Sequence, residues 1–176
     1  LAKKVERKSP VNSAYQKHLL KLFPERSGAD IRRAAGDIRC QSGNRDGFAS
    51  ALRRFGTYGP MVRRVLKNSG LHSDIQYLPF VESSYSPKAY SRVGAAGLWQ
   101  IMPATGRTLG LELDATVDER LDPEAASWAA ARYLKDARKT LTVAAQAKNN
   151  RVSHSELSPF VITSYNYGVN GMRRAI

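Results

Sequence analysis

The sequence predicts a mainly α-helical protein, and three observations lead to that fold class. Apolar residues recur at the three- and four-residue intervals of amphipathic helices along most of the chain. A capping residue precedes proline at Asp122-Pro123 and Ser158-Pro159, an arrangement typical of helix starts. Residues 1–69 lack the alternating pattern of a strand, and only residues 92–93 and 111–113 could form short strand pieces.

The length and composition fit one domain, or one domain with an extension. A chain of 176 residues can bury a sizeable core, and its 42% apolar content is ordinary for a globular protein. No apolar run is long enough to span a bilayer. Cys40 is the single cysteine, which excludes an intrachain disulfide. We expect Leu1 to be a processing boundary and the natural chain to continue past Ile176, because a predicted helix is still running there.

The net charge of +13 is concentrated in the first half of the chain. Residues 1–80 hold 16 Lys/Arg and 6 Asp/Glu, a balance of +10, which leaves +3 for residues 81–176. The charge fits a solvated basic surface, or attraction to an anionic partner such as peptidoglycan carboxylates, a membrane surface or nucleic acid. No nucleic-acid-binding motif accompanies it, so we expect no nucleic-acid partner.

Residues 1–69 are predicted to be a basic helical extension. Residues 1–12 resemble a polar arm, and helices are expected over residues 13–23 and 29–40. A third short helix, over residues 48–55, should stop at Gly56 and Gly59. Pro60 should then start a fourth helix, which ends before Gly70.

Residues 70–176 are predicted to be a second, catalytic domain. Ser73 is a plausible N-cap for a helix over residues 73–85, which Pro79 should weaken or kink one turn before Glu82. Pro103 should start a short helix that runs to residue 109, and Asp122-Pro123 a long one that ends near residue 141.

The last predicted helix carries a tyrosine and an asparagine. Residues 147–155 are polar and predict a surface loop, after which Ser158-Pro159 should start the helix. That helix presents Tyr165 and Asn166 before it ends at Gly168.

Glu82 is the residue in this sequence that most suggests chemistry. It lies in an apolar and aromatic run near the end of a predicted helix, and both surroundings disfavour a negative charge. The pKa of its carboxyl should therefore be raised, and a carboxyl that is neutral near pH 7 can act as a general acid. The alternative is a solvated helix residue without a chemical role.

The residues that follow Glu82 form an ordered motif. The motif consists of Glu82, Ser83, Tyr85, Pro87, Ser91, Gly94, Ala95, Gly97, Leu98 and Gln100, and a second box consists of Tyr165, Asn166, Tyr167 and Gly168. In these two boxes the chain resembles the lytic transglycosylases with an SLT-type catalytic domain, over roughly residues 70–176. Trp99 and residues 117–123 look more like the membrane-bound lytic transglycosylase D subgroup than the soluble subgroup.

This resemblance implies a lysozyme-like fold and a specific reaction. Such enzymes cleave the β-1,4 bond between N-acetylmuramic acid and N-acetylglucosamine without water and leave 1,6-anhydromuramic acid ends. Glu82 would serve as the single general acid and base. The resemblance also implies peptidoglycan glycan strands as partner, no cofactor, no metal, and a location in the bacterial periplasm or cell envelope. Association with an anionic membrane surface stays open.

Carried over by position, five further residues would form the substrate site: Ser91, Gln100, Tyr165, Tyr85 and Asn166. Ser91 would bond the muramoyl sugar and Gln100 would bind substrate, although a turn hydroxyl and a backbone-satisfying amide are equally open interpretations. Tyr165 would lie across from Glu82, although a core aromatic whose hydroxyl reaches a partner is an equally open interpretation, and Tyr85 would line the cleft. Asn166 is expected to brace the loop at residues 94–97.

Some residues depart from the family pattern or have ordinary structural interpretations. Ser164 and Tyr167 stand where small residues are usual, so the role of Tyr167 is open, and Trp99 is expected in the core. Asp122 should cap a helix, and Asp118 and Glu119 should pair with Arg120 or other basic groups.

Three other functions stay open beside the transglycosylase, and one of them, a nucleic-acid binder, is suggested by the charge alone. A goose-type lysozyme-like hydrolase would share the fold, but the sequence offers no second acid in the central motif. A catalytically weak peptidoglycan-binding scaffold would not need the intact acid and its matched partners.

Overall fold

The computed structural model describes residues 7–8, 39–40, 45–148 and 153–176. The chain divides into two compact units, Leu1–Asp46 and Gly47–Ile176. The described part of the first unit is an antiparallel pair of strands, β1 (Arg7–Lys8) and β2 (Arg39–Cys40), with Arg7 opposite Cys40. Residues 39–40 were predicted to end a helix, and this is wrong because their backbone pairs with β1 instead. The rest of that helix and the predicted helix over residues 13–23 lie outside the described residues.

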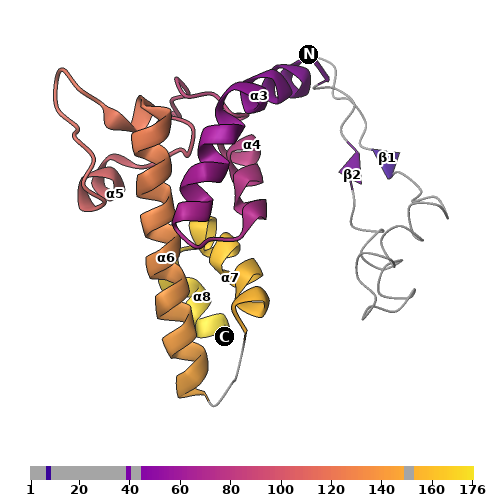
Figure 1. Cartoon of the computed structure of the whole chain (residues 1–176), viewed down its shortest axis with the longest axis vertical. Coiled ribbons are helices and arrows are strands. Elements are labelled where there is room, and N and C mark those ends of the chain that lie inside the picture. Colours follow the sequence, from indigo (N-terminus) through magenta and orange to yellow (C-terminus); the bar gives the residue numbers. More distant parts are fainter. Residues whose placement is uncertain (1–6, 9–38, 41–44, 149–152) are drawn as a thin grey trace. The chain divides into compact units, whose positions relative to one another are not determined.

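The second unit is built from helices, as the sequence predicts. In chain order they are α3 (Arg45–Asn68, whose first two residues precede the unit), the 3₁₀ helix η1 (Ser73–Tyr77), α4 (Leu78–Ser83), α5 (Pro103–Thr108), the 3₁₀ helix η2 (Glu119–Leu121), α6 (Pro123–Ala147), α7 (His154–Tyr167) and α8 (Val169–Ala175). The long helix α6 packs against α7 and α8 (Figure 1). The short helix η2 also contacts α6. No helix of the described part is long and apolar enough to cross a membrane.

Helix α3 is continuous where the sequence predicts two short helices. Pro60 removes one backbone hydrogen bond, at a cost of roughly 3 kcal/mol. A Cβ at Gly59 would lie 2.8 Å from the Phe55 ring, so the glycine lets that ring pack onto the helix. The residues after Pro60 that are buried in the core are Val62, Val65 and Leu66. Burying each contributes about 1.5–3 kcal/mol, so core packing outweighs the local helix breakers.

The predicted helix over residues 73–85 is two shorter pieces. His72, not Ser73, caps η1, because its Nδ1 accepts the Asp74 N–H. Pro79 is the second residue of α4, where a helix needs no N–H donor, so it starts that helix instead of kinking one. Glu82 is the next-to-last residue of α4.

The C-terminal helices begin with side-chain caps. Asp122 Oδ1 accepts the N–H groups of Glu124 and Ala125 and starts α6, as predicted. Helix α6 runs on to Ala147 instead of ending near residue 141, because Ala145 is still buried in the core. Helix α5 also forms where Pro103 predicts it.

Helix α7 begins earlier than predicted. Ser153 and Glu156 form a capping box, in which each side chain accepts the backbone N–H of the other. This cap satisfies two free N–H groups, so the helix starts there, and Pro159 lies inside its second turn. Gly168, with a φ of 80°, ends α7 as predicted. Residues 149–152 of the predicted loop lie outside the described part.

Trp99 lies at the centre of the core, as expected. It is fully buried, and its Nε1–H donates to Ser127 Oγ at 2.8 Å. The predicted strand pieces do not form: residues 92–93 lie in a turn, and in 111–113 only Leu113 makes an isolated bridge, with Asp118. Two further isolated bridges in the described residues pair Ala96 with Tyr90 and with Ile101.

The compact unit extends further toward the N-terminus than the predicted domain. Residues 47–69, which were expected in the extension, belong to the same unit as residues 70–176. A functional boundary at residue 69/70, between a basic extension and a catalytic domain, stays a prediction.

Candidate active site

Glu82 is half-buried and has one side-chain hydrogen-bond partner among the residues that the structure describes. Asn166 Nδ2, from the last turn of α7, donates to Glu82 Oε1 at 3.2 Å. Burial raises the pKa of the Glu82 carboxyl above its ordinary value, and the Asn166 hydrogen bond opposes part of that rise. Within the described part of the chain Oε2 has no partner, and no second carboxylate shifts this pKa. The group is therefore a reachable acid that keeps its proton to higher pH than an ordinary glutamate.

The chain turns sharply just after Glu82. Ser84 and Tyr85 have φ angles of 53° and 61°, a left-handed conformation that non-glycine residues rarely adopt. Arg54 of α3 donates Nε–H and Nη2–H to the Ser84 carbonyl at 3.0 and 2.8 Å. Ser83 Oγ donates to the Leu98 carbonyl at 2.7 Å. These bonds fix the end of α4 to α3 and to the loop that follows.

Ser91 and Gln100 hold the backbone of the loop at residues 89–101. Ser91 Oγ accepts the Ala95 N–H at 2.9 Å. Gln100 Nε2 donates to the carbonyls of Gly97 at 3.0 Å and Ala89 at 3.3 Å. Ser91 is thus a turn hydroxyl, and the Gln100 amide is bonded to nearby backbone carbonyls, as the structural interpretations predict. The substrate-binding roles of both residues stay predictions.

A mostly buried ion pair, between Arg120 and Asp118, is hydrogen-bonded to the same loop at residues 89–101. We call Arg120, Asp118 and Tyr90 the Arg120 brace. Arg120 Nε and Nη2 donate to the two Asp118 oxygens at 2.8 and 2.7 Å, and Tyr90 donates its hydroxyl to Asp118 Oδ2 at 2.8 Å. Arg120 Nη1 donates to the carbonyls of Gly94 at 2.8 Å and Ile101 at 3.0 Å. The brace therefore joins both ends of the loop.

Gly97 lies against the backbone of Arg120. A Cβ at this position would lie 1.7 Å from the Arg120 carbonyl oxygen, and the Gly97 φ is 78°. Close approach and backbone conformation both require glycine here.

The brace was only partly predictable. The pairing of Asp118 with Arg120 is confirmed. The hydrogen bond from Arg120 is the main cause of the lowered pKa of Asp118, and burial opposes it. Glu119 does not pair with Arg120, because its carboxylate accepts the Glu112 N–H at 2.7 Å. The role of Tyr90 and the two carbonyl contacts of Arg120 have no signal in the sequence, since they depend on how the loop folds back.

Tyr165 lies beside Glu82 without bonding to it. Its hydroxyl donates to the Trp99 carbonyl at 2.7 Å. Burial raises the Tyr165 pKa well above its ordinary value, and the negative charge of Glu82 raises it further. Gln100, Tyr133 and Tyr165 are among the residues that line a small hollow of about 110 Å³. Tyr165 is therefore close to the acid, but its hydroxyl is engaged elsewhere.

The structure corrects two of the expected site residues. Tyr85 does not line a cleft: it is fully buried between Phe55 and Phe80, and its hydroxyl donates to the Gln76 carbonyl at 2.5 Å. Asn166 does not brace the loop at residues 94–97, because its amide reaches Glu82 instead. Tyr85 follows α4 and joins the rings of Phe55 and Phe80, whereas Glu82, near the end of α4, meets the last turn of α7.

Comparison with known proteins shows the family of the chain. Residues 63–176 match the Transglycosylase SLT domain family, so the chain belongs to that family, whose domain is lysozyme-like. Over 70 residues the chain is 39% identical to Membrane-bound lytic murein transglycosylase D of Escherichia coli K12. It is 34% identical over 79 residues to Peptidoglycan transglycosylase gp16 of Escherichia phage T7. These matches cover 40% and 44% of this chain, but only 16% and 6% of the two relatives.

Proposed function

We propose that the protein is a peptidoglycan lytic transglycosylase with Glu82 as its single general acid and base. The observation that carries this proposal is the state of Glu82. Its pKa is raised by burial, one oxygen is held by Asn166, and the other has no partner in the described part of the chain. Family membership and the names of the two relatives support the substrate class.

In the first step the protonated carboxyl of Glu82 gives its proton to the glycosidic oxygen. The bond between that oxygen and C1 of N-acetylmuramic acid breaks, and N-acetylglucosamine leaves with the proton. In the second step the Glu82 carboxylate accepts the proton of the muramoyl 6-hydroxyl, whose oxygen bonds to C1. The product is the 1,6-anhydro sugar, and Glu82 is protonated again. Because the nucleophile belongs to the reacting sugar, its effective concentration is high.

In the described residues no second carboxylate acts on Glu82, which favours this reaction over hydrolysis. Glycoside hydrolases usually place two carboxyl groups roughly 5–9.5 Å apart, the second acting as nucleophile or as base for water. In the described residues no other carboxylate influences the Glu82 pKa. The intramolecular 6-hydroxyl removes the need for such a group.

Ser91 and Gln100 retain hydrogen-bonding capacity for the sugar. The Ser91 hydroxyl accepts from Ala95 but has no acceptor for its own hydrogen among the described residues. Gln100 uses its NH₂ on backbone carbonyls, which leaves its Oε1 available. We assign both to substrate binding, and Tyr165 to the apolar wall beside the acid.

The products of purified sacculi test the assignment. Fragments that end in 1,6-anhydromuramic acid should form, each lighter by one water than its hydrolytic counterpart, with no added metal or cofactor. Reducing muramic acid ends would instead indicate the lysozyme-like hydrolase. Sacculus binding without any cleavage would indicate the scaffold. The proposed substrate places the protein in the bacterial periplasm or cell envelope.

A further inference from the structure

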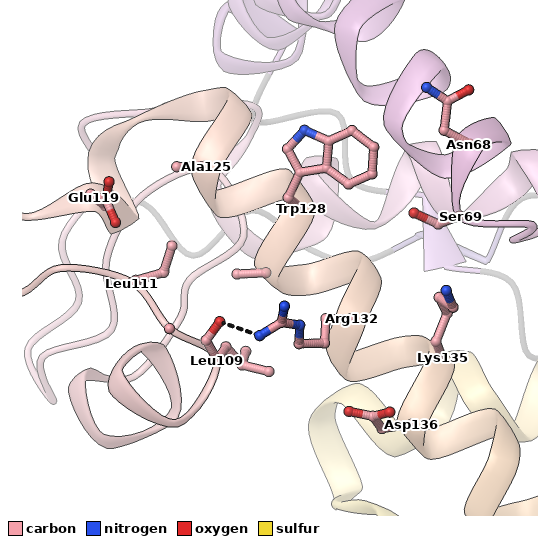
Figure 2. A pocket seen from close by; sticks show the side chains of 12 residues that line it. Asn68, Ser69, Leu109, Leu111, Glu119, Ala125, Trp128, Arg132, Lys135 and Asp136 are labelled. Carbon is pink, nitrogen blue, oxygen red and sulfur yellow. Dashed lines mark hydrogen bonds between the residues drawn. The ribbon is translucent and has the colours of Figure 1, made fainter.

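A second, larger hollow lies on another face of α6. It is bounded by the end of α3, the segment at residues 109–111 and the first half of α6 (Figure 2), and has a volume of about 580 Å³. That size is within the range of ligand sites, roughly 300–1,000 Å³. Glu82 does not line it, whereas Tyr133 and Ala130 of α6 line the small hollow beside Tyr165. The two hollows therefore use different residues of the same helix.

Four polar side chains of this hollow have no hydrogen-bonding partner in the described part of the chain. They are an amide, a hydroxyl, an ammonium and a carboxylate, contributed by Asn68, Ser69, Lys135 and Asp136. Ser69 is only 8% exposed. No buried side-chain oxygen or nitrogen of the described residues lacks a partner, so the unpaired Ser69 hydroxyl is open to solvent in the hollow and is available there to a ligand. Arg132, by contrast, is engaged in the wall, since it donates to the Leu109 carbonyl at 3.2 Å.

Trp128 supplies an aromatic surface to the same hollow. It is 43% exposed, whereas the chain's other tryptophan, Trp99, is fully buried. Figure 2 shows its indole nearly face-on, between the labelled Asn68 and Ala125. A large aromatic ring left half in water beside uncommitted polar groups is typical of a binding site. The apolar C–H face of a pyranose ring suits such a surface, and its hydroxyl and acetamido groups suit the surrounding donors and acceptors.

We infer that this hollow binds a saccharide segment of peptidoglycan at a second site, with a sugar ring on Trp128 and its acidic substituent toward Lys135. The identity of the polymer rests on the proposed function. Two sites on one long strand act as a multivalent contact, because binding at one raises the local concentration of strand at the other. The second site should therefore raise affinity for sacculi without changing the chemical step at Glu82.

Tryptophan fluorescence tests saccharide binding directly. In the full chain carrying Glu82→Gln, a soluble oligomer of N-acetylglucosamine should change the emission of Trp128, while buried Trp99 contributes a constant background. The change should disappear in Glu82→Gln/Trp128→Phe. An emission change of equal size in the two proteins would overturn the second site, because it would come from Trp99, whose carbonyl is bonded to Tyr165 beside Glu82. A response to a free stem peptide but to no oligosaccharide would overturn the saccharide assignment.

Co-sedimentation with sacculi tests the contribution to affinity. On the same Glu82→Gln background, Trp128→Ala should weaken binding about tenfold, a modest share of what a second site can add. Val143→Ala, an exposed apolar residue of α6 outside this hollow, is the matched control and should bind normally. Lys135→Gln should weaken binding a few-fold at low salt and less at high salt. If all three variants bind alike, the second site does not exist.

The outcome is separable from that of the proposed function. With Glu82 intact, Trp128→Ala should release anhydro ends from short soluble glycans at the rate of the unchanged protein. Failure of the unchanged protein to form anhydro ends would refute the proposed function and leave the saccharide measurements valid. Normal cleavage with no effect of Trp128 or Lys135 would refute the second site alone.

Discussion

The Arg120 brace and the Glu82–Asn166 pair are both polar contacts near the same loop, yet they differ in nearly every physical respect. In the brace, Asp118 accepts hydrogen bonds from Arg120 and Tyr90 through both oxygens, and Arg120 Nη1 donates to two carbonyls. Among the described residues, Glu82 has one side-chain hydrogen bond, from the exposed Asn166, and its second oxygen has no partner. Both carboxylate oxygens of Asp118 therefore accept hydrogen bonds, whereas only one oxygen of Glu82 does so in the described part of the chain.

The two carboxyl groups accordingly shift in opposite directions. Hydrogen bonds and charge from Arg120 lower the pKa of Asp118, so it stays ionised and structural. Burial with little compensation raises the pKa of Glu82, so it can hold and release a proton. The carboxyl group with hydrogen bonds to both oxygens, Asp118, is the structural one, and the carboxyl group with a hydrogen bond to one oxygen, Glu82, is the candidate catalytic one.

The largest expected effect comes from removing the titrating group of the Glu82–Asn166 pair. Glu82→Gln keeps the size and the Asn166 contact but cannot transfer a proton. Turnover of sacculi should fall by about 10²–10⁴-fold or more, since the acid and base steps share this group. Product release measured by chromatography checks this, with Glu112→Gln as a control in an exposed glutamate. Substantial residual turnover would place the acid elsewhere.

The next largest effect is expected in the Arg120 brace. Asp118→Asn leaves the buried Arg120 charge without its counter-ion and should cost about 3–5 kcal/mol of unfolding free energy. The matched control is Glu124→Gln, which breaks an arginine pair of similar length, 2.8 against 2.7 Å, whose side chains are 57% and 50% exposed instead of 7% and 19%. That change should cost at most about 1 kcal/mol. Urea unfolding of both variants gives the comparison, and equal losses would refute the role of burial.

The stability that Asp118 contributes should depend on pH, and Asp118→Asn should lack this dependence. Because the folded-state pKa of Asp118 is lowered, its contribution is fully present above the ordinary aspartate pKa and is lost as pH falls through the lower folded value. Acid should therefore destabilise the unchanged protein more steeply than Asp118→Asn.

A smaller effect is expected on the proton affinity of Glu82. Asn166 donates to the carboxylate and stabilises the ionised form, so Asn166→Ala should raise the Glu82 pKa further. The alkaline limb of the activity profile, where the protonated acid is lost, should then move to higher pH. The rate at the optimum should change by less than about tenfold, because Glu82 keeps its proton-transfer role. An unmoved limb would mean that the amide does not act on this carboxyl.

The smallest effect is at the rim of the brace. Tyr90→Phe removes one of the hydrogen bonds to Asp118 and should cost roughly 0.5–1.5 kcal/mol in urea unfolding. Activity per folded molecule should be retained. A loss as large as that of Asp118→Asn would show that Tyr90, not Arg120, holds the loop.

Local signals in the sequence were enough for several features. Asp122 caps α6 and Gly168 ends α7 as predicted, because a cap depends only on residues within one turn. The raised pKa of Glu82 was predictable from its apolar neighbours in the chain. Trp99 was correctly expected in the core.

Other features depend on residues far apart in the chain. Helix α3 continues through Gly59 and Pro60 because its later residues are buried in the core. The helix propensities of neighbouring residues do not predict that burial. Tyr85 and Asn166 both lie away from their expected surroundings: Tyr85 is in the core instead of the cleft, and Asn166 reaches Glu82 across 84 positions instead of the loop at residues 94–97. The sequence by itself determined which residue can carry the proton. Only the tertiary structure decided which groups touch that residue, because packing selects contacts by space and burial, not by distance along the chain.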